Sequence, residues 1–244
     1  MKGEILKEDA DMPRIVLVGG GSSSGKSFLT GEVIRRIGKE HVTHLALDDY
    51  YKDQSDMPLE ERYKVNYDHP RAFDWPLLRK QIRELKEGKT IQKPTYDFVT
   101  LTRGKEVETI SPQPLIVIEG IMALVDASLR ELGDLRVFIE ASAERRFLRR
   151  MIRDAKERGR SFENIVHQYF DTVQPMYDEI VQPSSMYADL IINNDGVENR
   201  AINVLTVLFQ TELEAATRGD EAPRKQEEEF SEDALSSVFA KHEK

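Results

Sequence analysis

The chain has 244 residues, no cysteine and a formal net charge of −9 at pH 7. The lack of cysteine excludes disulfide bonds and cysteine-ligated zinc sites and favours a cytoplasmic protein, and the acidic balance disfavours nucleic acid as a partner because its phosphate backbone would be repelled. The longest apolar stretch, residues 114–125, is interrupted by Glu119 and is too short to span a bilayer, so no membrane partner is expected.

Short apolar runs alternate with amphipathic helical patterns, which predicts an α/β protein with a parallel sheet covered by helices on both faces. The expected strands are residues 14–18, 43–47, 115–118, 135–139 and 190–192. One helix is expected to begin after the N-cap Asp74. Near the C-terminus, another helix is expected to form one apolar face from Ala201, Val204, Leu205 and Leu208.

Two segments depart from this alternation of strands and helices. Residues 89–110 alternate in the manner of strands about residues 103–105, which predicts a β-hairpin outside the sheet. Residues 145–162 hold a dense arginine run in which Gly159 marks a helix break. We therefore expect an N-terminal extension (1–12), one domain (13–217) and an acidic, mobile tail (218–244).

A glycine-rich motif, G-x-x-x-x-G-K-S, follows the first expected strand and precedes a helical pattern. Its glycines let consecutive backbone N–H groups point inward, and the helix N-terminus adds partial positive charge, so the loop suits a phosphate group. Lys26 can then reach the β- and γ-phosphates, and the Ser27 hydroxyl can ligate Mg²⁺. The predicted nucleotide-binding loop consists of Gly20, Gly21, Ser22, Ser23, Ser24, Gly25, Lys26 and Ser27.

Carboxylates follow the next two strands: Asp48 comes after the second and Glu119 after the third. Because ligands gather at the carboxyl ends of parallel strands, both side chains are expected to converge on the metal and the terminal phosphate. Mg²⁺ prefers hard oxygen ligands and keeps several waters, so Ser27, Asp48 and Glu119 are the predicted metal ligands. A turn residue that caps the strand is the alternative for Asp48.

The arginine run has two interpretations. Arg146, Arg150 and Arg153 share one helical face, and the break at Gly159 suits a lid that places arginines over the phosphates. Such a lid would exclude water and balance the charge of the transition state. A solvated basic helix face is the alternative.

Several separated stretches together resemble the uridine kinase family of P-loop nucleoside kinases. They are GGGSSSGKS, DDYYKD, MPLEERYKVNYDHP, PTYDFVTLTR, IEGI, RRMIRDAKERGRS and QYFDTVQPMYDEIVQPSSMYAD, and the likeness runs from about residue 14 to residue 208. The resemblance implies a P-loop kinase fold and Mg-dependent transfer of the γ-phosphate of ATP or GTP to the 5′-hydroxyl of uridine or cytidine. It also implies a cytoplasmic enzyme of pyrimidine salvage that forms a homo-oligomer, commonly a tetramer.

The resemblance also implies roles for matching residues. Asp48 matches the carboxylate that accepts the 5′-hydroxyl proton, and Lys26 and the lid arginines match groups that neutralise the phosphoryl group. The residues that match the nucleoside pocket are Tyr51, Tyr67, Asp68, Tyr96 and Phe98, of which Asp68 suits the ribose hydroxyls. The residues that match the lid and its contacts are Arg150, Arg153, Arg158 and Gln168, with Arg150 and Gln168 also facing the nucleoside and Arg158 the nucleotide.

Two positions depart from the family pattern. Leu101 stands where the family usually has a histidine that hydrogen-bonds the pyrimidine, and the lost bond is worth about 1–3 kcal/mol. Either Thr100 or a water compensates, or the acceptor is a different nucleoside or a small alcohol. Residues 193–196 read Asn-Asn-Asp-Gly where the family often has Pro-Arg-Gly, which leaves the choice between ATP and GTP open.

Other classes of function fit less well. A GTPase switch would show D-x-x-G and N-K-x-D motifs after the third and fifth strands, and this chain has neither there. A sugar-phosphate kinase would need a second anion site, whereas the expected aromatic side chains suit a flat base. An inactive homologue would not need the complete set of Lys26, Ser27, Asp48 and Glu119.

Overall fold

The computed structural model describes residues 12–196 and 198–218. Most of the predicted N-terminal extension and nearly all of the predicted acidic tail lie outside these residues. No helix within the described residues combines the length and the hydropathy needed to cross a bilayer.

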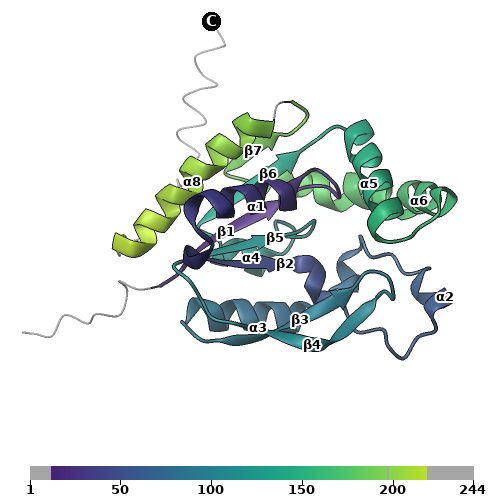
Figure 1. Cartoon of the computed structure of the whole chain (residues 1–244), viewed down its shortest axis with the longest axis horizontal. Coiled ribbons are helices and arrows are strands. Elements are labelled where there is room, and N and C mark those ends of the chain that lie inside the picture. The colour runs from purple at the N-terminus through teal and green to yellow at the C-terminus, as the bar shows by residue number, and fades with distance from the viewer. Residues whose placement is uncertain (1–11, 197, 219–244) are drawn as a thin grey trace, which may run out of the picture.

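A five-stranded parallel sheet in the order β2–β5–β1–β6–β7 forms the centre of the protein (Figure 1). Its strands are β1 Arg14–Gly19, β2 Val42–Ala46, β5 Leu115–Glu119, β6 Leu135–Glu140 and β7 Leu190–Asn193. All five predicted strands are confirmed, with ends that differ by a residue at most. Leu47 was predicted in β2 but begins the 3-10 turn η2 (Leu47–Tyr50), which carries Asp48 away from the sheet.

Helices surround the sheet. They are α1 Lys26–Ile37, α2 Leu59–Arg62, α3 Trp75–Lys86, α4 Ala127–Leu132, α5 Ala143–Glu157, α6 Phe162–Gln168, α7 Gln174–Met176 and α8 Glu198–Arg218. Short 3-10 and π-helical turns complete the chain: η1 Lys39–His41, η3 Pro70–Ala72, η4 Tyr169–Val173, η5 Tyr177–Val181 and η6 Gln182–Tyr187. Helix α3 begins where the sequence predicts, because the Asp74 carboxylate accepts a hydrogen bond from the Leu77 N–H at 3.2 Å.

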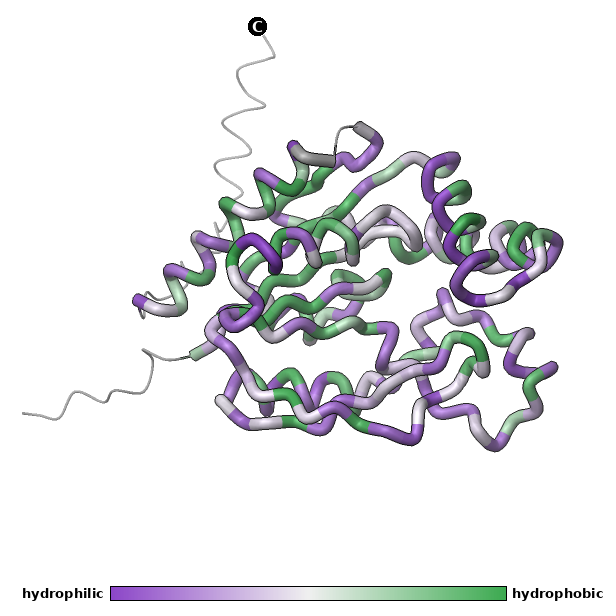
Figure 2. The backbone as a smooth tube through the Cα atoms, viewed as in Figure 1, coloured by the Kyte–Doolittle hydropathy of each residue, from purple (hydrophilic) through white to green (hydrophobic). Residues whose placement is uncertain are grey.

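Alternation along the strands divides the apolar core into two layers. Val16 and Val18 point to the face that α1 and α8 cover, whereas Ile15 and Leu17 point to the face of α3 and α4. Figure 2 shows the apolar runs concentrated along the strands. The prediction of a sheet covered on both faces is therefore confirmed.

The buried stripe of α8 differs in part from the predicted one. It contains Ala201, Ile202, Leu205 and Phe209, whereas Val204 is 48% exposed. The prediction for Val204 was wrong because α8 packs against α1 and β1 through a stripe that begins at positions 201 and 202, which turns position 204 to solvent.

The predicted hairpin consists of β3 (Ile91–Asp97) and β4 (Thr102–Ile110), an antiparallel pair beside α3 and below the sheet in Figure 1. Its turn lies at residues 98–101 and not at 103–105, since Arg103 pairs with Tyr96 within the ladder. The Arg103 guanidinium donates to the Tyr51 carbonyl at 3.0 Å and to Asp74 at 3.0 Å. These contacts fix the hairpin turn next to η2, where the aromatic side chains gather.

Candidate active site

Three neighbouring strands end level with one another. Glu119, the last residue of β5, is in register with Val18 of β1 and Ala46 of β2. The glycine-rich loop begins just after Val18, and Asp48 lies just after Ala46. The loop and both carboxylates therefore meet at one edge of the sheet, as the sequence predicts.

Close packing and backbone conformation require glycine at two positions of the loop. A Cβ atom on Gly20 would lie 2.2 Å from the Ile139 carbonyl oxygen, and Gly20 also has a positive φ of 134°. Gly25 adopts φ 98° directly before α1, so the chain can turn into the helix at Lys26. The Lys26 ammonium donates to the carbonyl oxygens of Gly20 at 2.8 Å and Gly21 at 2.7 Å. The loop thus folds around its own lysine.

The charges at this edge influence one another. Burial lowers the pKa of Lys26 to about 8, against the opposing effect of Glu119 and Asp48. Burial likewise raises the pKa of Asp48, although Arg158 and Lys26 lower it. The buried Lys26 and Glu119 and the half-buried Asp48, at a loop of backbone donors, form a site suited to a ligand that carries both negative charge and a cation.

A cavity of about 830 Å³, the loop cavity, opens beside these groups. It is lined by Ser22, Ser23, Gly25, Lys26, Ser27, Phe28, Ala46, Asp48, Glu119, Gly120, Ile121, Arg149 and Arg153. Of the other predicted loop residues, Gly20 and Gly21 hold Lys26 through their carbonyls. Ser24 lies beneath the loop, where its carbonyl accepts from the Asn194 side chain at 2.8 Å.

The side chains of the loop cavity fit Mg²⁺. Glu119 is buried, and its Oε2 has no hydrogen-bond partner, whereas Oε1 lies 3.1 Å from the His44 ring nitrogen. Ser27 and Asp48 line the same cavity and add hard oxygen donors. Within the described residues, no three His, Cys, Asp or Glu side chains are grouped closely enough to hold a metal by themselves. This set therefore suits an ion that takes other ligands from water and phosphate.

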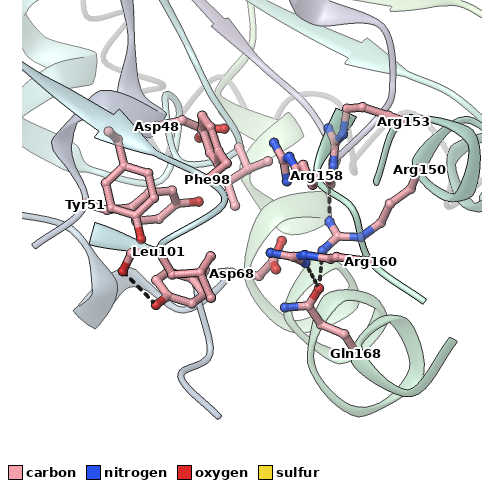
Figure 3. A pocket seen from close by; sticks show the side chains of 14 residues that line it. Asp48, Tyr51, Asp68, Phe98, Leu101, Arg150, Arg153, Arg158, Arg160 and Gln168 are labelled. Atoms are coloured by element: carbon pink, nitrogen blue, oxygen red, sulfur yellow. Dashed lines mark hydrogen bonds between the residues drawn. The ribbon is translucent and has the colours of Figure 1, made fainter. Parts of the chain in front are cut away.

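A second cavity of about 460 Å³, the aromatic cavity, lies next to the first. Every residue predicted to bind the acceptor lines it, namely Asp48, Tyr51, Tyr67, Asp68, Tyr96, Phe98, Leu101, Arg150 and Gln168. The Tyr51 ring contacts Tyr67 edge-on at 5.4 Å between centroids and lies 5.1 Å from Tyr96. Figure 3 shows Asp48, Tyr51 and Asp68 on one side, facing the arginines and Gln168 across the cavity.

The two cavities adjoin. Ser22, Asp48, Ile121 and Arg153 line both of them. Asp48 is the only carboxylate among these four, and it comes from η2 directly after β2. A group that passes from a ligand in one cavity to a ligand in the other therefore passes beside Asp48.

Arginines of α5 and of the segment after it form the other wall. The Arg150 guanidinium donates to the Ser22 hydroxyl at 2.8 Å and to Gln168 at 2.9 Å, which ties α5 to the loop. Arg158 was predicted on the nucleotide side, but it lines the aromatic cavity and stacks 4.2 Å above the Phe98 ring. Burial lowers the pKa of Arg158 to about 10. The predicted helix break at Gly159 is present, with φ 62°.

Sequence reasoning missed four titratable residues of this region. Arg160 lines the aromatic cavity and Arg149 the loop cavity, and both were assigned only to the arginine run. Asp154 contacts four arginines, and its position in the sequence, one of two acids between Arg153 and Arg158, did not mark it as the buried one. His44 contacts Glu119 from the neighbouring strand, and no pattern in the sequence marks that contact.

Comparison with known proteins gives one family. The family model described as "Phosphoribulokinase / Uridine kinase family" matches residues 15–201. A uridine kinase of Deinococcus deserti is 44% identical over 201 residues, which are 82% of this chain and 97% of that protein. A uridine kinase of Ligilactobacillus salivarius is 45% identical over 193 residues, 79% of this chain and 91% of that protein.

Among solved structures, phosphoribulokinase from Rhodobacter spheroides has a TM-score of 0.54 and 17% identity, and the match covers 75% of this chain and 70% of that one. This likeness concerns the fold alone and agrees with the predicted P-loop kinase architecture. The residues matched by the family model include the glycine-rich loop and both walls of the aromatic cavity. The chain therefore belongs to the phosphoribulokinase/uridine kinase family.

Proposed function

We propose that this protein transfers the γ-phosphate of ATP or GTP to the 5′-hydroxyl of uridine or cytidine and releases UMP or CMP. The observation that carries the proposal is the position of Asp48, which lines both the loop cavity and the aromatic cavity. The uridine kinases that are 44% and 45% identical over most of their length support the choice of substrate.

In this proposal the triphosphate occupies the loop cavity. The backbone N–H groups of the loop and the N-terminus of α1 bind the phosphates, and Lys26 turns from its two loop carbonyls to the β- and γ-phosphates. Ser27, Asp48 and Glu119 would hold Mg²⁺. When bound, Mg²⁺ neutralises charge on the transferring group.

The nucleoside occupies the aromatic cavity. Tyr51, Tyr67, Tyr96 and Phe98 provide apolar faces for a base, and the buried Asp68 accepts hydrogen bonds from the ribose hydroxyls. Aromatic faces favour a nucleoside over a sugar phosphate as acceptor.

The chemical step needs alignment and charge balance more than a covalent intermediate. The 5′-oxygen attacks the γ-phosphorus, the bond to the bridging oxygen breaks, and the nucleoside diphosphate leaves with its electron pair. Asp48 orients the hydroxyl and accepts its proton. Arg150 and Arg153 line the path of the phosphoryl group, so their charge opposes the charge that develops there.

A nucleoside panel tests the proposal. The purified protein is incubated with Mg-ATP and each of uridine, cytidine, adenosine, guanosine, thymidine and ribulose 5-phosphate, and the products are identified by mass spectrometry. UMP and CMP are expected as the main products. Phosphorylation of ribulose 5-phosphate alone, or ATP consumption that no nucleoside stimulates, would contradict the assignment.

Replacing Leu101 with histidine is expected to raise kcat/KM for uridine about tenfold. Leu101 lines the aromatic cavity with a buried side chain and a left-handed φ of 54°, a conformation that histidine adopts more readily than leucine. One hydrogen bond to a buried base is worth about 1–3 kcal/mol, and about 1.4 kcal/mol equals tenfold. Steady-state kinetics with uridine measure the change. The control Val99→His alters the exposed side of the same turn and should change nothing. An unchanged kcat/KM in Leu101→His would show that position 101 does not contact the base.

The proposal extends to a homo-oligomer and a cytoplasmic location. The family resemblance supports a tetramer, and the absence of cysteine from the sequence favours a reducing compartment. Sedimentation equilibrium of the purified protein measures the oligomeric state, and cell fractionation tests the location.

A further inference from the structure

A single carboxylate lies at the centre of the arginine wall. The Asp154 side chain is 0% exposed, and four guanidinium groups surround it. The distances to its carboxylate oxygens are 2.8 Å from Arg153 Nε, 3.4 Å from Arg150 Nε, 3.4 Å from Arg158 Nη1 and 3.6 Å from Arg160 Nη1. We call these four residues the arginine cluster.

Helix α5 and the segment that follows it both supply arginines to the cluster. Arg150 lies one turn before Asp154 on α5, and Arg158 lies one turn after it, where the helix ends. Gly159 then reverses the chain with a φ of 62°, so that the Arg160 N–H donates to the Asp154 carbonyl oxygen at 3.1 Å. Both the backbone and the side chain of Asp154 therefore fix the path of the segment after α5.

The charges of the cluster do not cancel. Burial raises the pKa of Asp154, but Arg153, Arg150 and Arg158 outweigh that effect and hold it below its usual value, so the carboxylate is ionised. The cluster thus places four positive charges around the one negative charge of Asp154, and Asp48 and Asp68 add two carboxylates to the cavity that the arginines line. Like charges at such distances repel where water is excluded, and Asp154 is the carboxylate that contacts all four of these arginines.

The positive charge of the cluster faces the aromatic cavity, where the proposed reaction takes place. All four arginines of the cluster line the aromatic cavity, and Asp154 does not. Arg150 also reaches the loop through the Ser22 hydroxyl, and Arg150 and Arg160 both donate to Gln168 (Figure 3). Asp154 therefore does not contact a ligand in the cavity, and the arginines that it contacts connect it to the reaction.

We propose that Asp154 is a positioning residue that gathers the arginine cluster along the wall of the aromatic cavity, with Arg153 at the junction of the two cavities, before the substrates bind. The proposal rests on the proposed phosphoryl transfer. The carboxylate fixes where the guanidinium groups lie, and one carboxylate does not neutralise four guanidinium groups, so they keep positive charge that can oppose the charge of the transferring phosphoryl group. A misplacement of about 1 Å in such a group can cost about 100-fold in rate.

The test replaces Asp154 with asparagine, which has nearly the same shape and no charge. We expect kcat for the nucleoside that the wild-type protein phosphorylates to fall about 100-fold. The Kd for ADP should stay within about threefold, because the arginines remain present and the site loses a negative charge. The Asp154→Glu variant keeps the charge, and its kcat should be at least about tenfold higher than that of Asp154→Asn.

A matched control breaks a partly buried carboxylate–guanidinium pair elsewhere. Glu212 of α8 lies 2.5 Å from the Arg14 guanidinium at the start of β1, where neither residue lines the two cavities. Glu212→Gln should lower the melting temperature and leave kcat and the Kd for ADP unchanged. Comparison of Asp154→Asn with Glu212→Gln separates a positioning role from a loss of stability.

A second readout does not depend on the acceptor. Phenylglyoxal modifies accessible arginines, and mass spectrometry locates the modified residues. Arg158 and Arg160 should react slowly in the wild-type protein, since their side chains are 16% and 10% exposed, and faster in Asp154→Asn. If no nucleoside is phosphorylated by the wild-type protein, the proposed function fails, and this readout still decides whether Asp154 holds the cluster.

Three results would overturn the proposal. The first is a folded Asp154→Asn variant with nearly full kcat and a lowered melting temperature. The second is unchanged arginine modification in that variant. The third is the failure of both Asp154 variants to fold, which would show that the carboxylate serves the fold itself.

Discussion

Replacing Asp48 with asparagine is expected to lower kcat about a thousandfold while the Kd for ATP stays within about threefold. General-base catalysis contributes about 10²- to 10⁴-fold, and asparagine keeps the size of the side chain but cannot accept the hydroxyl proton. Asp48 is also the carboxylate that lines both cavities. Single-turnover kinetics and calorimetric titration with ATP measure the two quantities separately.

The neighbouring residue offers a matched control. Asp49 lies on the same turn, but its carboxylate pairs with Lys93 of the hairpin and lines neither cavity. Asp49→Asn should therefore leave kcat within a few-fold of the wild-type value. If Asp48→Asn retains nearly full turnover, Asp48 is not the base, and the hydroxyl must lose its proton to water or to the phosphate itself.

The edge of the sheet was predictable because its determinants are local in the sequence. Apolar runs mark the strands, and Asp48 and Glu119 follow two of them directly, so the rule for parallel strands brings them together without tertiary information. The N-cap Asp74 was predictable for the same reason, since a cap bonds a backbone N–H three residues away.

Other features depend on contacts between distant segments. The Asp97 carboxylate closes the hairpin turn locally by accepting from the Val99 N–H at 2.8 Å, but the place of the hairpin beside η2 depends on Arg103, whose partners Asp74 and Tyr51 are far away in the sequence. His44 meets Glu119 only through the register of β2 and β5. Asp154 was hidden because charge counting treats an arginine run as a solvated face, whereas Gly159 folds the run back onto a buried carboxylate.

Replacing Lys26 with methionine is expected to lower kcat by about 100- to 1,000-fold and to weaken ATP binding. Loss of one preorganised donor to a developing negative charge costs about that much. The Lys26 ammonium is buried, and the Gly20 and Gly21 carbonyls accept its hydrogen bonds at 2.8 and 2.7 Å. Burial favours its neutral form and lowers its pKa to about 8, so a bound polyphosphate restores a favourable partner for the charge. Steady-state kinetics and calorimetry with ATP measure both effects.

Two further variants separate the position of the charge from its presence. Lys26→Arg keeps a cation, but a planar guanidinium does not fit the point between two carbonyls that an ammonium fills, so kcat should recover by less than about tenfold. Lys93→Met removes another buried lysine, whose partners are Asp49 and Glu108, and should leave kcat within a few-fold. Full activity in Lys26→Arg would mean that net charge at the loop suffices. The conformation of the loop around Lys26 would then result from its glycines alone and would not be needed to position the ammonium at the phosphates.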